Sequence, residues 1–206
     1  MPDGIQRGLG TMALVVLTPL LIVLAALVRA DSAGPALYAA ERMGVGGRPF
    51  RCLKFRTMRW RPEHGGPGIT VRDDPRVTRL GKVLRRLRLD ELPQLINVAR
   101  GEMNLIGPRP EDPQYVDFDN PLHRLVFASK PGITGLAQLA FADEARLLGP
   151  DPHVAERHYR ATILPRKVAL DADYLSRRSW RVDLWILART VLAVIGQRSA
   201  DESSVG

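Results

Sequence analysis

The chain has 206 residues, enough for one compact domain with a sizeable hydrophobic core. Its 30 basic residues, most of them arginines, outnumber its 22 acidic residues and give a formal net charge of +8. This excess favours an anionic partner: nucleic acid, a phosphorylated substrate or an anionic membrane surface. The single cysteine, Cys52, excludes an intramolecular disulfide and a multi-cysteine metal site. The histidines lack the spacing of a zinc site and are expected to be solvated surface residues: His64, His123, His153 and His158.

A run of uncharged, mostly apolar residues separates Arg7 from Arg29. Its length, about 20 residues, suits a helix that crosses a bilayer. It is long for a signal peptide, and LVRADSAG offers a poor cleavage site. Pro19 removes a hydrogen bond in mid-helix, and the Thr18 hydroxyl can bond to the preceding turn. Composition alone favours a spanning helix over a bent one that enters and leaves the same face. The polar, basic chain after Arg29 places the body of the protein in the cytoplasm.

The next segments predict a β-hairpin, a loop and a helix, in that order. Residues 35–58 contain two strand-like stretches that flank the turn GVGG. Residues 60–75 are rich in Gly and Pro and predict a loop. Residues 76–87 predict a helix, because their apolar residues fall at helical spacing: Leu80, Val83, Leu84 and Leu87. The other face of this helix is cationic.

A second helix is expected from Glu91 to Ala99, ending near Gly101. Residues 102–121 contain four prolines and are expected to be largely loop.

The C-terminal part of the chain is expected to be helical. Residues 153–177 predict a helix that is interrupted at Pro165. The stretch SWRVDLWILARTVLAVIG has an apolar face, with Trp180 and Trp185 near its start. Tryptophans beside arginines are typical of a helix in a membrane interface. A core helix that buries both tryptophans is the alternative.

Asp90 and Glu91 directly follow a cluster of arginines, and two interpretations compete for them. The first is structural: Asp is a preferred N-cap, Glu is favoured in the first turn of a helix, and Pro93 is tolerated there. The second is chemical. Helix N-termini bind phosphate, and neighbouring cations would keep Asp90 ionised. Adjacent carboxylates can hold Mg²⁺, and an ionised Asp can form a phosphoryl-aspartate, so the segment has the equipment for phosphoryl transfer.

Six motifs follow one another between Asp31 and Val194: DSAGPALY, ERMGVGGRPF, KFRTM, DPRVTRLGKVLRRLRLDELPQLINVARGEMNLIGPRP, KPGITGLAQ and DLWILARTVLAV, within a resemblance that runs from about residue 7 to 196. With these motifs the chain resembles the bacterial sugar transferases, small monotopic phosphoglycosyl transferases. These enzymes move a sugar-1-phosphate from a UDP-sugar onto a polyprenyl phosphate such as undecaprenyl phosphate. The resemblance implies that Asp90 attacks the diphosphate, that UMP leaves, and that the phosphosugar stays covalently on the enzyme until the lipid takes it.

The resemblance also assigns roles to individual residues. Glu91 matches the second member of the catalytic dyad, which assists with Mg²⁺ and proton handling, so both carboxylates are expected to bind the metal. The residues Lys54, Arg85 and Arg109 match basic residues that are expected to bind phosphate. Thr18-Pro19 matches the break in a helix that dips into one leaflet and returns. The resemblance therefore replaces the spanning helix with a re-entrant one.

We accordingly predict an α+β fold: a re-entrant membrane helix, a short β-hairpin, and a mostly helical cytoplasmic catalytic domain with interfacial amphipathic helices. The expected divisions are residues 1–30 for the membrane helix, 31–198 for the catalytic domain and 199–206 for a disordered tail. The expected partners are a UDP-sugar, a polyprenyl phosphate and the lipid bilayer, with Mg²⁺ as cofactor. The expected location is the cytoplasmic face of the bacterial plasma membrane. Nucleic acid is not expected, and a homodimer is left open.

The sequence departs from the family pattern after GLAQL. Many members carry an arginine there that is thought to contact the nucleotide sugar, and Ala142 stands in its place. Two alternatives to the covalent reaction also stay open. In the first, the polyprenyl phosphate attacks directly and Asp90 serves as base or metal ligand. In the second, the chain is a non-catalytic, membrane-tethered basic protein that binds nucleic acid or anionic lipid.

Overall fold

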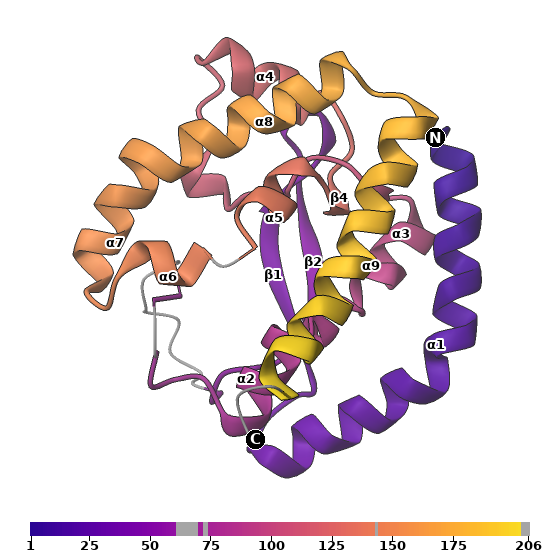
Figure 1. The fold of residues 1–206 in the computed structure, drawn as a ribbon, viewed down its shortest axis with the longest axis vertical. Helices are drawn as coiled ribbons and strands as arrows, with labels where there is room; N and C mark the ends of the chain where they lie inside the picture. The colour runs from indigo at the N-terminus through magenta and orange to yellow at the C-terminus, as the bar shows by residue number, and fades with distance from the viewer. Residues whose placement is uncertain (61–69, 72–73, 143, 203–206) are drawn as a thin grey trace.

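A computed structural model describes residues 1–60, 70–71, 74–142 and 144–202. Its architecture is α+β, with helices arranged around a β-hairpin (Figure 1). Most of the loop expected over residues 60–75 lies outside the described residues.

The predicted hairpin is confirmed. Strand β1 (Leu37–Met43) pairs antiparallel with β2 (Pro49–Phe55), and Tyr38 lies opposite Lys54. A 3₁₀ turn, Val45–Gly47, joins the strands. Gly46 and Gly47 have φ angles of 67° and 72° there, which glycine adopts without the steric cost that a side chain would add.

The N-terminal helix α1 (Asp3–Asp31) is long and apolar enough to cross a membrane, and it is bent (Figure 1). Pro19 lies inside the helix, where it cannot donate a backbone hydrogen bond. The Thr18 hydroxyl donates instead to the carbonyl of Leu14, at 2.7 Å. We call the part before Pro19 the N-terminal arm and the part after it the C-terminal arm.

Both arms of α1 contact the same body. In the N-terminal arm, the Gln6 side chain accepts a hydrogen bond from the backbone N–H of Ile106 at 2.9 Å. Beside the C-terminal arm, the buried Arg56 guanidinium donates to the carbonyls of Val28 and Ser32 at 3.0 and 2.6 Å. Many apolar side chains of α1 nevertheless face outward: Ile5, Leu9, Met12, Val15, Val16, Leu20, Ile22, Val23 and Leu27.

Helix α2 (Arg79–Arg86) confirms the first predicted helix after the hairpin. Its N-cap, Thr78, accepts a hydrogen bond from the backbone N–H of Gly81 at 2.9 Å. The apolar face is narrower than the spacing suggested, because Leu84 is buried whereas Val83 is 40% exposed.

Helix α3 (Gln94–Arg100) starts three residues later than predicted. Its N-cap position is Pro93, so the interpretation of Asp90 as a helix cap is wrong. Gly101 ends the helix with a φ of 80°, as the sequence indicated.

The segment expected to be loop, residues 102–121, contains a strand. Strand β3 (Asn104–Ile106) pairs in parallel with β4 (Gly132–Thr134). The backbone at Gly132, in β4, lies very close to that of Gly107, the residue after β3. A Cβ atom on Gly132 would lie 2.1 Å from the backbone nitrogen of Gly107. This pairing sets the start of the loop that carries Arg109.

The remaining helices surround these strands. They are α4 (Pro121–Phe127), α5 (Leu136–Ala140), α6 (Glu144–Leu148), α7 (Pro152–His158), α8 (Leu164–Ser176) and α9 (Trp180–Glu202). The helix predicted over residues 153–177 is interrupted, but before Pro165: a π-helical turn, Tyr159–Ile163, separates α7 from α8, and Pro165 lies in the first turn of α8. The expectation for His123 is wrong: this side chain is buried on α4, and its Nδ1 accepts a hydrogen bond from the backbone N–H of Asp117.

Helix α9 decides between the two interpretations of its tryptophans. Trp180 is 60% exposed and Trp185 is 51% exposed, so the alternative of a core helix that buries them is wrong. The helix extends to Glu202, within the tail predicted over residues 199–206; residues 203–206 lie outside the described part.

Candidate active site

Asp90 and Glu91 lie in a buried 3₁₀ turn, Leu89–Glu91, between α2 and α3. Each residue is only 9% exposed. The turn also packs against β2, the strand that carries Lys54. The two carboxylates are therefore held on a short turn inside the domain and not at a helix N-terminus.

The Glu91 carboxylate is held by two cations. Its Oε1 lies 2.8 Å from Nζ of Lys54 and 3.8 Å from Nη2 of Arg109. Burial alone would raise the pKa of Glu91, but the charges of Lys54 and Arg109 outweigh burial and lower that pKa to about 2. Glu91 is therefore ionised across the physiological pH range.

The Asp90 carboxylate has a different environment. Within the described part of the chain, no hydrogen bond or ion pair engages its oxygens. Burial and the neighbouring charge of Glu91 raise the pKa of Asp90, and the cations Lys54, Arg85 and Arg88 oppose that rise without cancelling it. The sequence predicted that cationic neighbours would favour the ionised form, and the structure adds the opposing effect of burial. One carboxylate is thus paired, and the other is unengaged.

The structure brings together all five residues predicted to act at this site. Lys54 comes from β2, and Arg109 comes from the loop after β3. Arg85, in the last turn of α2, lies close enough to Asp90 and Glu91 to interact with both charges, and its Nε donates to the Thr57 hydroxyl at 2.8 Å. The other two predicted residues, Thr18 and Pro19, lie in α1, away from this site.

A buried cluster that the sequence did not reveal lies behind Arg109. The Lys167 ammonium lies 2.7 Å from Glu111 Oε1 and 3.1 Å from Glu144 Oε2, and its residue is 2% exposed. The Tyr159 hydroxyl donates to the other Glu111 oxygen at 2.7 Å. After Glu91, the carboxylates Glu144 and Glu111 are the charges that most raise the pKa of Arg109. The cluster therefore fixes the loop that presents Arg109 to Glu91.

Asp171 also supports Arg109. Its Oδ2 accepts the backbone N–H of Arg109 at 3.1 Å, while its buried Oδ1 is without a hydrogen-bond partner among the described residues. Burial raises the pKa of Asp171 to about 7. In the sequence, Asp171 and Lys167 resemble ordinary polar residues of a surface helix, so no local signal marks them.

Arg88 directly precedes the turn Leu89–Glu91, which we call the carboxylate turn. Its backbone is left-handed, with φ 57° and ψ 17°. It is the only non-glycine residue with positive φ in the described ranges. This conformation costs an L-residue roughly 1–2 kcal/mol, more than the roughly 0.3–1 kcal/mol that a cation gains at a helix C-terminus. Glycine or asparagine is the usual residue after a helix end. The ending of α2 does not by itself explain an arginine here.

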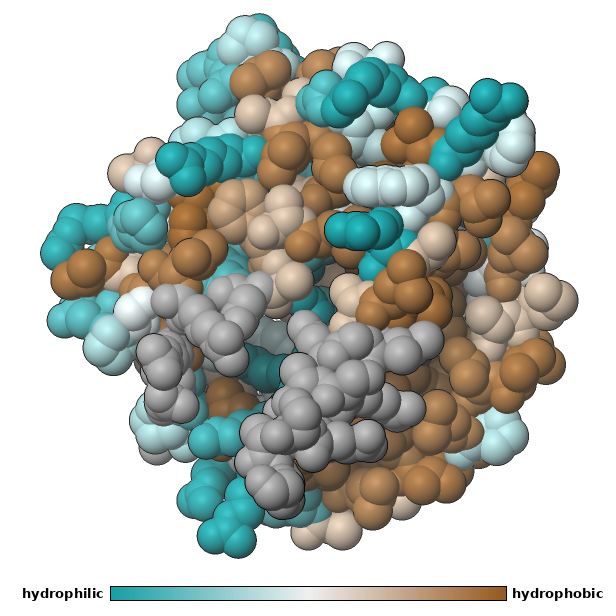
Figure 2. Space-filling model, in the orientation of Figure 1, coloured by the Kyte–Doolittle hydropathy of each residue, from teal (hydrophilic) through white to brown (hydrophobic). Residues whose placement is uncertain are grey.

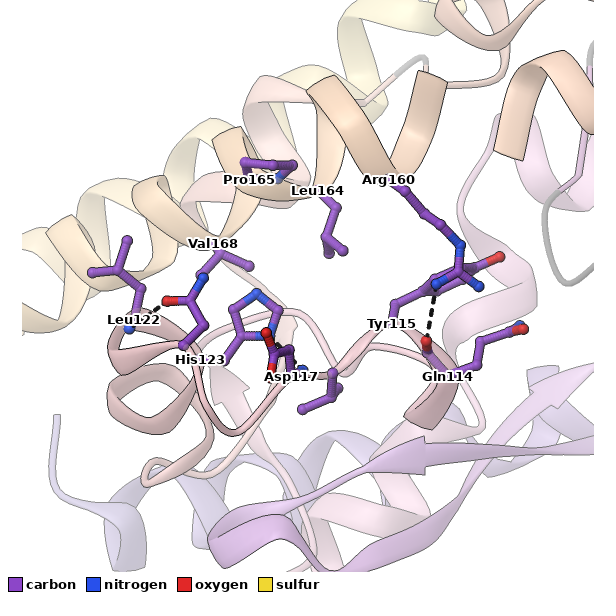
Figure 3. Close-up of a pocket in the computed structure, with 11 residues that line it drawn as sticks. Gln114, Tyr115, Asp117, Leu122, His123, Arg160, Leu164, Pro165 and Val168 are labelled. Atoms are coloured by element: carbon purple, nitrogen blue, oxygen red, sulfur yellow. Dashed lines mark hydrogen bonds between the residues drawn. The ribbon is translucent and has the colours of Figure 1, made fainter. Parts of the chain in front are cut away.

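A narrow hollow opens beside Glu91 and is lined by Lys54, Glu91 and Arg109, together with Cys52 and Gln94; Asp90 is not one of its lining residues. A larger cavity of about 320 Å³ lies elsewhere, between the 3₁₀ turn Pro113–Tyr115, α4 and α8. Figure 3 shows this cavity, which His123 borders on one side and Leu164 and Val168 on the other. None of the residues predicted for the site lines it, so size alone does not locate the site.

The carboxylate pair fits a Mg²⁺ ion only as a partial ligand set. Within the described residues, groups of three or more His, Cys, Asp or Glu side chains that could share a metal are absent. Mg²⁺ commonly takes one or two protein carboxylates and completes its shell with waters and substrate phosphates. The unengaged oxygens of Asp90 suit this role better than Glu91 Oε1, which already faces Lys54.

Comparisons with known proteins match nearly the whole chain. The sequence model of a family described as bacterial sugar transferase matches residues 4–197. A UDP-glucose:undecaprenyl-phosphate glucose-1-phosphate transferase of Caulobacter vibrioides is 38% identical over 92% of this chain and 69% of that protein. A UDP-N-acetylgalactosamine-undecaprenyl-phosphate N-acetylgalactosaminephosphotransferase of Aeromonas hydrophila is 36% identical over 93% of this chain but only 44% of that protein. The exopolysaccharide production protein ExoY of Sinorhizobium fredii is 34% identical over 92% of this chain and 83% of that protein.

Proposed function

Because the chain belongs to the bacterial sugar transferase family, we propose that it transfers a sugar-1-phosphate from a UDP-sugar to undecaprenyl phosphate and releases UMP. The observation that carries this proposal is the buried pair in which two cations hold Glu91, while no described residue bonds to the Asp90 carboxylate. The names of two relatives support it, since both describe transfer to undecaprenyl phosphate, one from UDP-glucose and one from UDP-N-acetylgalactosamine. The product would enter glycan assembly.

The charges near the pair suit a diphosphate. Four cations influence the two carboxylates: Lys54, Arg85 and Arg109, which we assign to phosphate, and Arg88, whose guanidinium bonds to the carbonyl of Ala142. They leave an excess of two positive charges, and the diphosphate of a nucleotide sugar carries about two negative ones. Arginine forks and a lysine ammonium are the usual protein groups for such oxygens. Lys54, Arg85 and Arg109 would stabilise charge as it moves onto the leaving group.

In the first step, an ionised Asp90 oxygen attacks the phosphorus that bears the sugar. A new bond forms between the carboxylate oxygen and phosphorus. The bond from that phosphorus to the bridging oxygen breaks, and UMP leaves with the electron pair. Lys54 and Arg109, held in place by Glu91, neutralise the oxygens of the diphosphate.

In the second step, a phosphate oxygen of undecaprenyl phosphate attacks the same phosphorus. The bond to Asp90 breaks, and the residue returns to a carboxylate that is ready for another donor. Direct attack of the lipid phosphate on the UDP-sugar is the alternative, with Asp90 as base or metal ligand. The two-step reaction requires a free carboxylate at Asp90, which the described residues leave available, and detection of an adduct on Asp90 distinguishes the two reactions.

We assign Mg²⁺ to the carboxylates of Asp90 and Glu91, with its other ligands from the diphosphate and water. When bound, the ion would neutralise phosphate charge and polarise the bond that breaks.

We also propose that α1 is re-entrant and that the site faces the cytoplasm. The support is geometric: a helix that crossed the bilayer would place its ends on opposite sides, whereas both arms of α1 contact one body. Figure 2 shows hydrophobic residues gathered along the edge that α1 forms in Figure 1. Such a surface would seat the site at the interface, where a soluble nucleotide sugar and a lipid phosphate can both reach it.

The test is an assay of UMP release from protein in nanodiscs that contain undecaprenyl phosphate, with Mg²⁺ and a panel of UDP-sugars. We expect UMP from at least one sugar, and loss of that activity with Asp90→Asn or with EDTA. Folding of the variant would be checked by circular dichroism. A folded wild-type protein that releases no UMP from any sugar would contradict the proposal. Steeply salt-dependent binding to duplex DNA, unchanged by Asp90→Asn, would then favour a basic binding protein.

A further inference from the structure

We propose that Arg88 is a positioning residue for the transfer, an inference that rests on the proposed function. Its guanidinium fixes the segment after α5 beside the carboxylate turn. Nη2 of Arg88 donates to the carbonyl of Ala142 at 2.5 Å. Arg88 is two residues before Asp90, whereas Ala142 lies 54 residues farther along the chain. One side chain thus joins the turn that carries both carboxylates to a distant segment.

The backbone of Arg88 takes part in the same junction. Its N–H donates to the carbonyl of Arg85 at 3.1 Å, and its own carbonyl accepts the N–H of Glu91 at 3.4 Å. The left-handed conformation between these bonds redirects the chain from α2 into the carboxylate turn. Strained backbone at a non-glycine residue persists where the surrounding structure requires that residue. The contact with Ala142 supplies a reason for an arginine where glycine would relieve the strain.

The segment that Arg88 holds leads to the other half of the site. Glu144, two residues after Ala142, pairs with Lys167, which also pairs with Glu111 behind Arg109. The carboxylate turn and the Arg109 loop are therefore linked through this segment as well as through the direct pair between Glu91 and Arg109. Loss of the Arg88 contact should allow the nucleophile and the phosphate-binding arginine to shift relative to each other. Displacements of about 1 Å can cost an enzyme a hundredfold in rate.

The test compares Arg88→Gly with Arg88→Lys. Glycine keeps the left-handed backbone and removes the guanidinium, so we expect an unchanged or higher melting temperature. We expect its kcat for UMP release to fall by about tenfold to a hundredfold, with KM for the UDP-sugar changed less than about threefold. Lysine can still donate to the Ala142 carbonyl, and we expect most of the rate to return. Lys82→Gln, the loss of an exposed cation on α2, is the matched control and should keep the wild-type rate.

A full rate in Arg88→Gly would overturn the proposal. So would a loss confined to KM, which would indicate a residue that only binds substrate. Amide hydrogen exchange gives a readout that does not depend on activity. Amide exchange over residues 136–142 should be faster in Arg88→Gly than in wild type. Equal exchange in the two proteins would overturn the positioning role. This result would hold whether or not the wild type releases UMP. Faster exchange in a protein without activity would leave the contact supported and the proposed function contradicted.

Discussion

Asp90 and Glu91 are adjacent in the chain, yet the fold gives them different tasks. Glu91 faces Lys54 and Arg109, so its charge is fixed and it orders the two cations that we propose to bind phosphate. Asp90 is buried beside them without a partner of its own among the described residues, which leaves its oxygens available to a phosphorus atom or a metal. Environments that separate two neighbouring carboxylates in this way are typical of sites where one acts and the other supports.

The pH dependence of the transfer should report the protonation of Asp90. Burial and Glu91 raise the pKa of Asp90, so activity should be present above that raised pKa and lost as the pH falls through it. Lys54 lowers the pKa of Asp90, so Lys54→Met should move the acid limb of kcat/KM to higher pH. The measurement is a pH profile of UMP release. Arg100→Met, which removes an exposed cation at the end of α3, is the control. An acid limb that stays in place or moves to lower pH in Lys54→Met would contradict this account.

The family resemblance pointed to five residues that the fold brings together, but local chemistry gave the wrong geometry for Asp90. An Asp before Glu and Pro93 has the usual composition of a helix start, yet α3 begins at Gln94. Tertiary contacts determine the conformation of Asp90, because the turn Leu89–Glu91 packs on α2 and β2 and buries both carboxylates. A propensity for capping is worth about 1 kcal/mol and is readily overridden by such packing.

At the scale of elements, we propose that the bend in α1 determines how the chain meets a membrane. The Pro19→Ala substitution restores a backbone donor and removes a residue that costs about 3 kcal/mol inside a helix. A straightened helix should no longer hold both arms on one body. We expect Gly4→Cys and Ala33→Cys to react with an impermeant maleimide from the same side in the wild-type background. In Pro19→Ala, we expect Gly4→Cys to react from the opposite side.

The native Cys52 is buried and gives little background in this experiment. Leu20→Ala, next to the bend, is the control and should leave the labelling pattern unchanged. Reaction of Gly4→Cys from the opposite side in the wild-type background would refute the re-entrant helix.

Arg56 fastens the C-terminal arm of α1 to the hairpin. Its buried guanidinium donates to carbonyls of the final turn and of the residues that follow: Val28, Ser32 and Ala33. Arg56→Met should lower the free energy of unfolding by about 2–4 kcal/mol, because charge-assisted hydrogen bonds are lost and the carbonyls remain without donors. Urea unfolding in a mild detergent measures this difference. Arg59→Met, at an exposed position four residues from the end of β2, should change stability by less than about 0.5 kcal/mol. Equal effects of the two substitutions would contradict this role for Arg56.

The elements that the sequence predicted are the ones with strong local patterns. The hairpin has a glycine-rich turn, and α2 has helical spacing and a threonine cap. Strands β3 and β4 have three residues each and pair in parallel across a long connection, so neither period nor turn chemistry marks them. The cluster of Glu111, Tyr159 and Lys167 likewise depends on contacts between residues about 50 positions apart.

At the scale of the whole molecule, the apolar surface is distributed over the ends of the chain. Exposed apolar residues line α1, and α9 adds Leu184, Val191 and Leu192 to its two exposed tryptophans. A soluble protein rarely leaves so much apolar surface uncovered. The sequence predicted the apolar character of both helices, but only the fold shows that both face outward.

Trp180 and Trp185 should enter the bilayer interface. In a Trp60→Phe background, only these two tryptophans remain. Their emission should shift to shorter wavelength and be quenched in bilayers with brominated acyl chains. Emission that is the same in brominated and ordinary lipid would show that α9 does not lie in the membrane.

The central claim is that Asp90 carries the phosphosugar between donor and lipid. The most direct measurement is the mass of the intact protein after acid quenching, with Mg²⁺ and the UDP-sugar donor present but undecaprenyl phosphate absent. The account predicts one equivalent of UMP and a sugar-phosphate adduct on the peptide that contains Asp90, discharged when the lipid is added and missing in Asp90→Asn. An enzyme that releases no UMP and forms no adduct until undecaprenyl phosphate is present would contradict the claim and establish direct attack by the lipid.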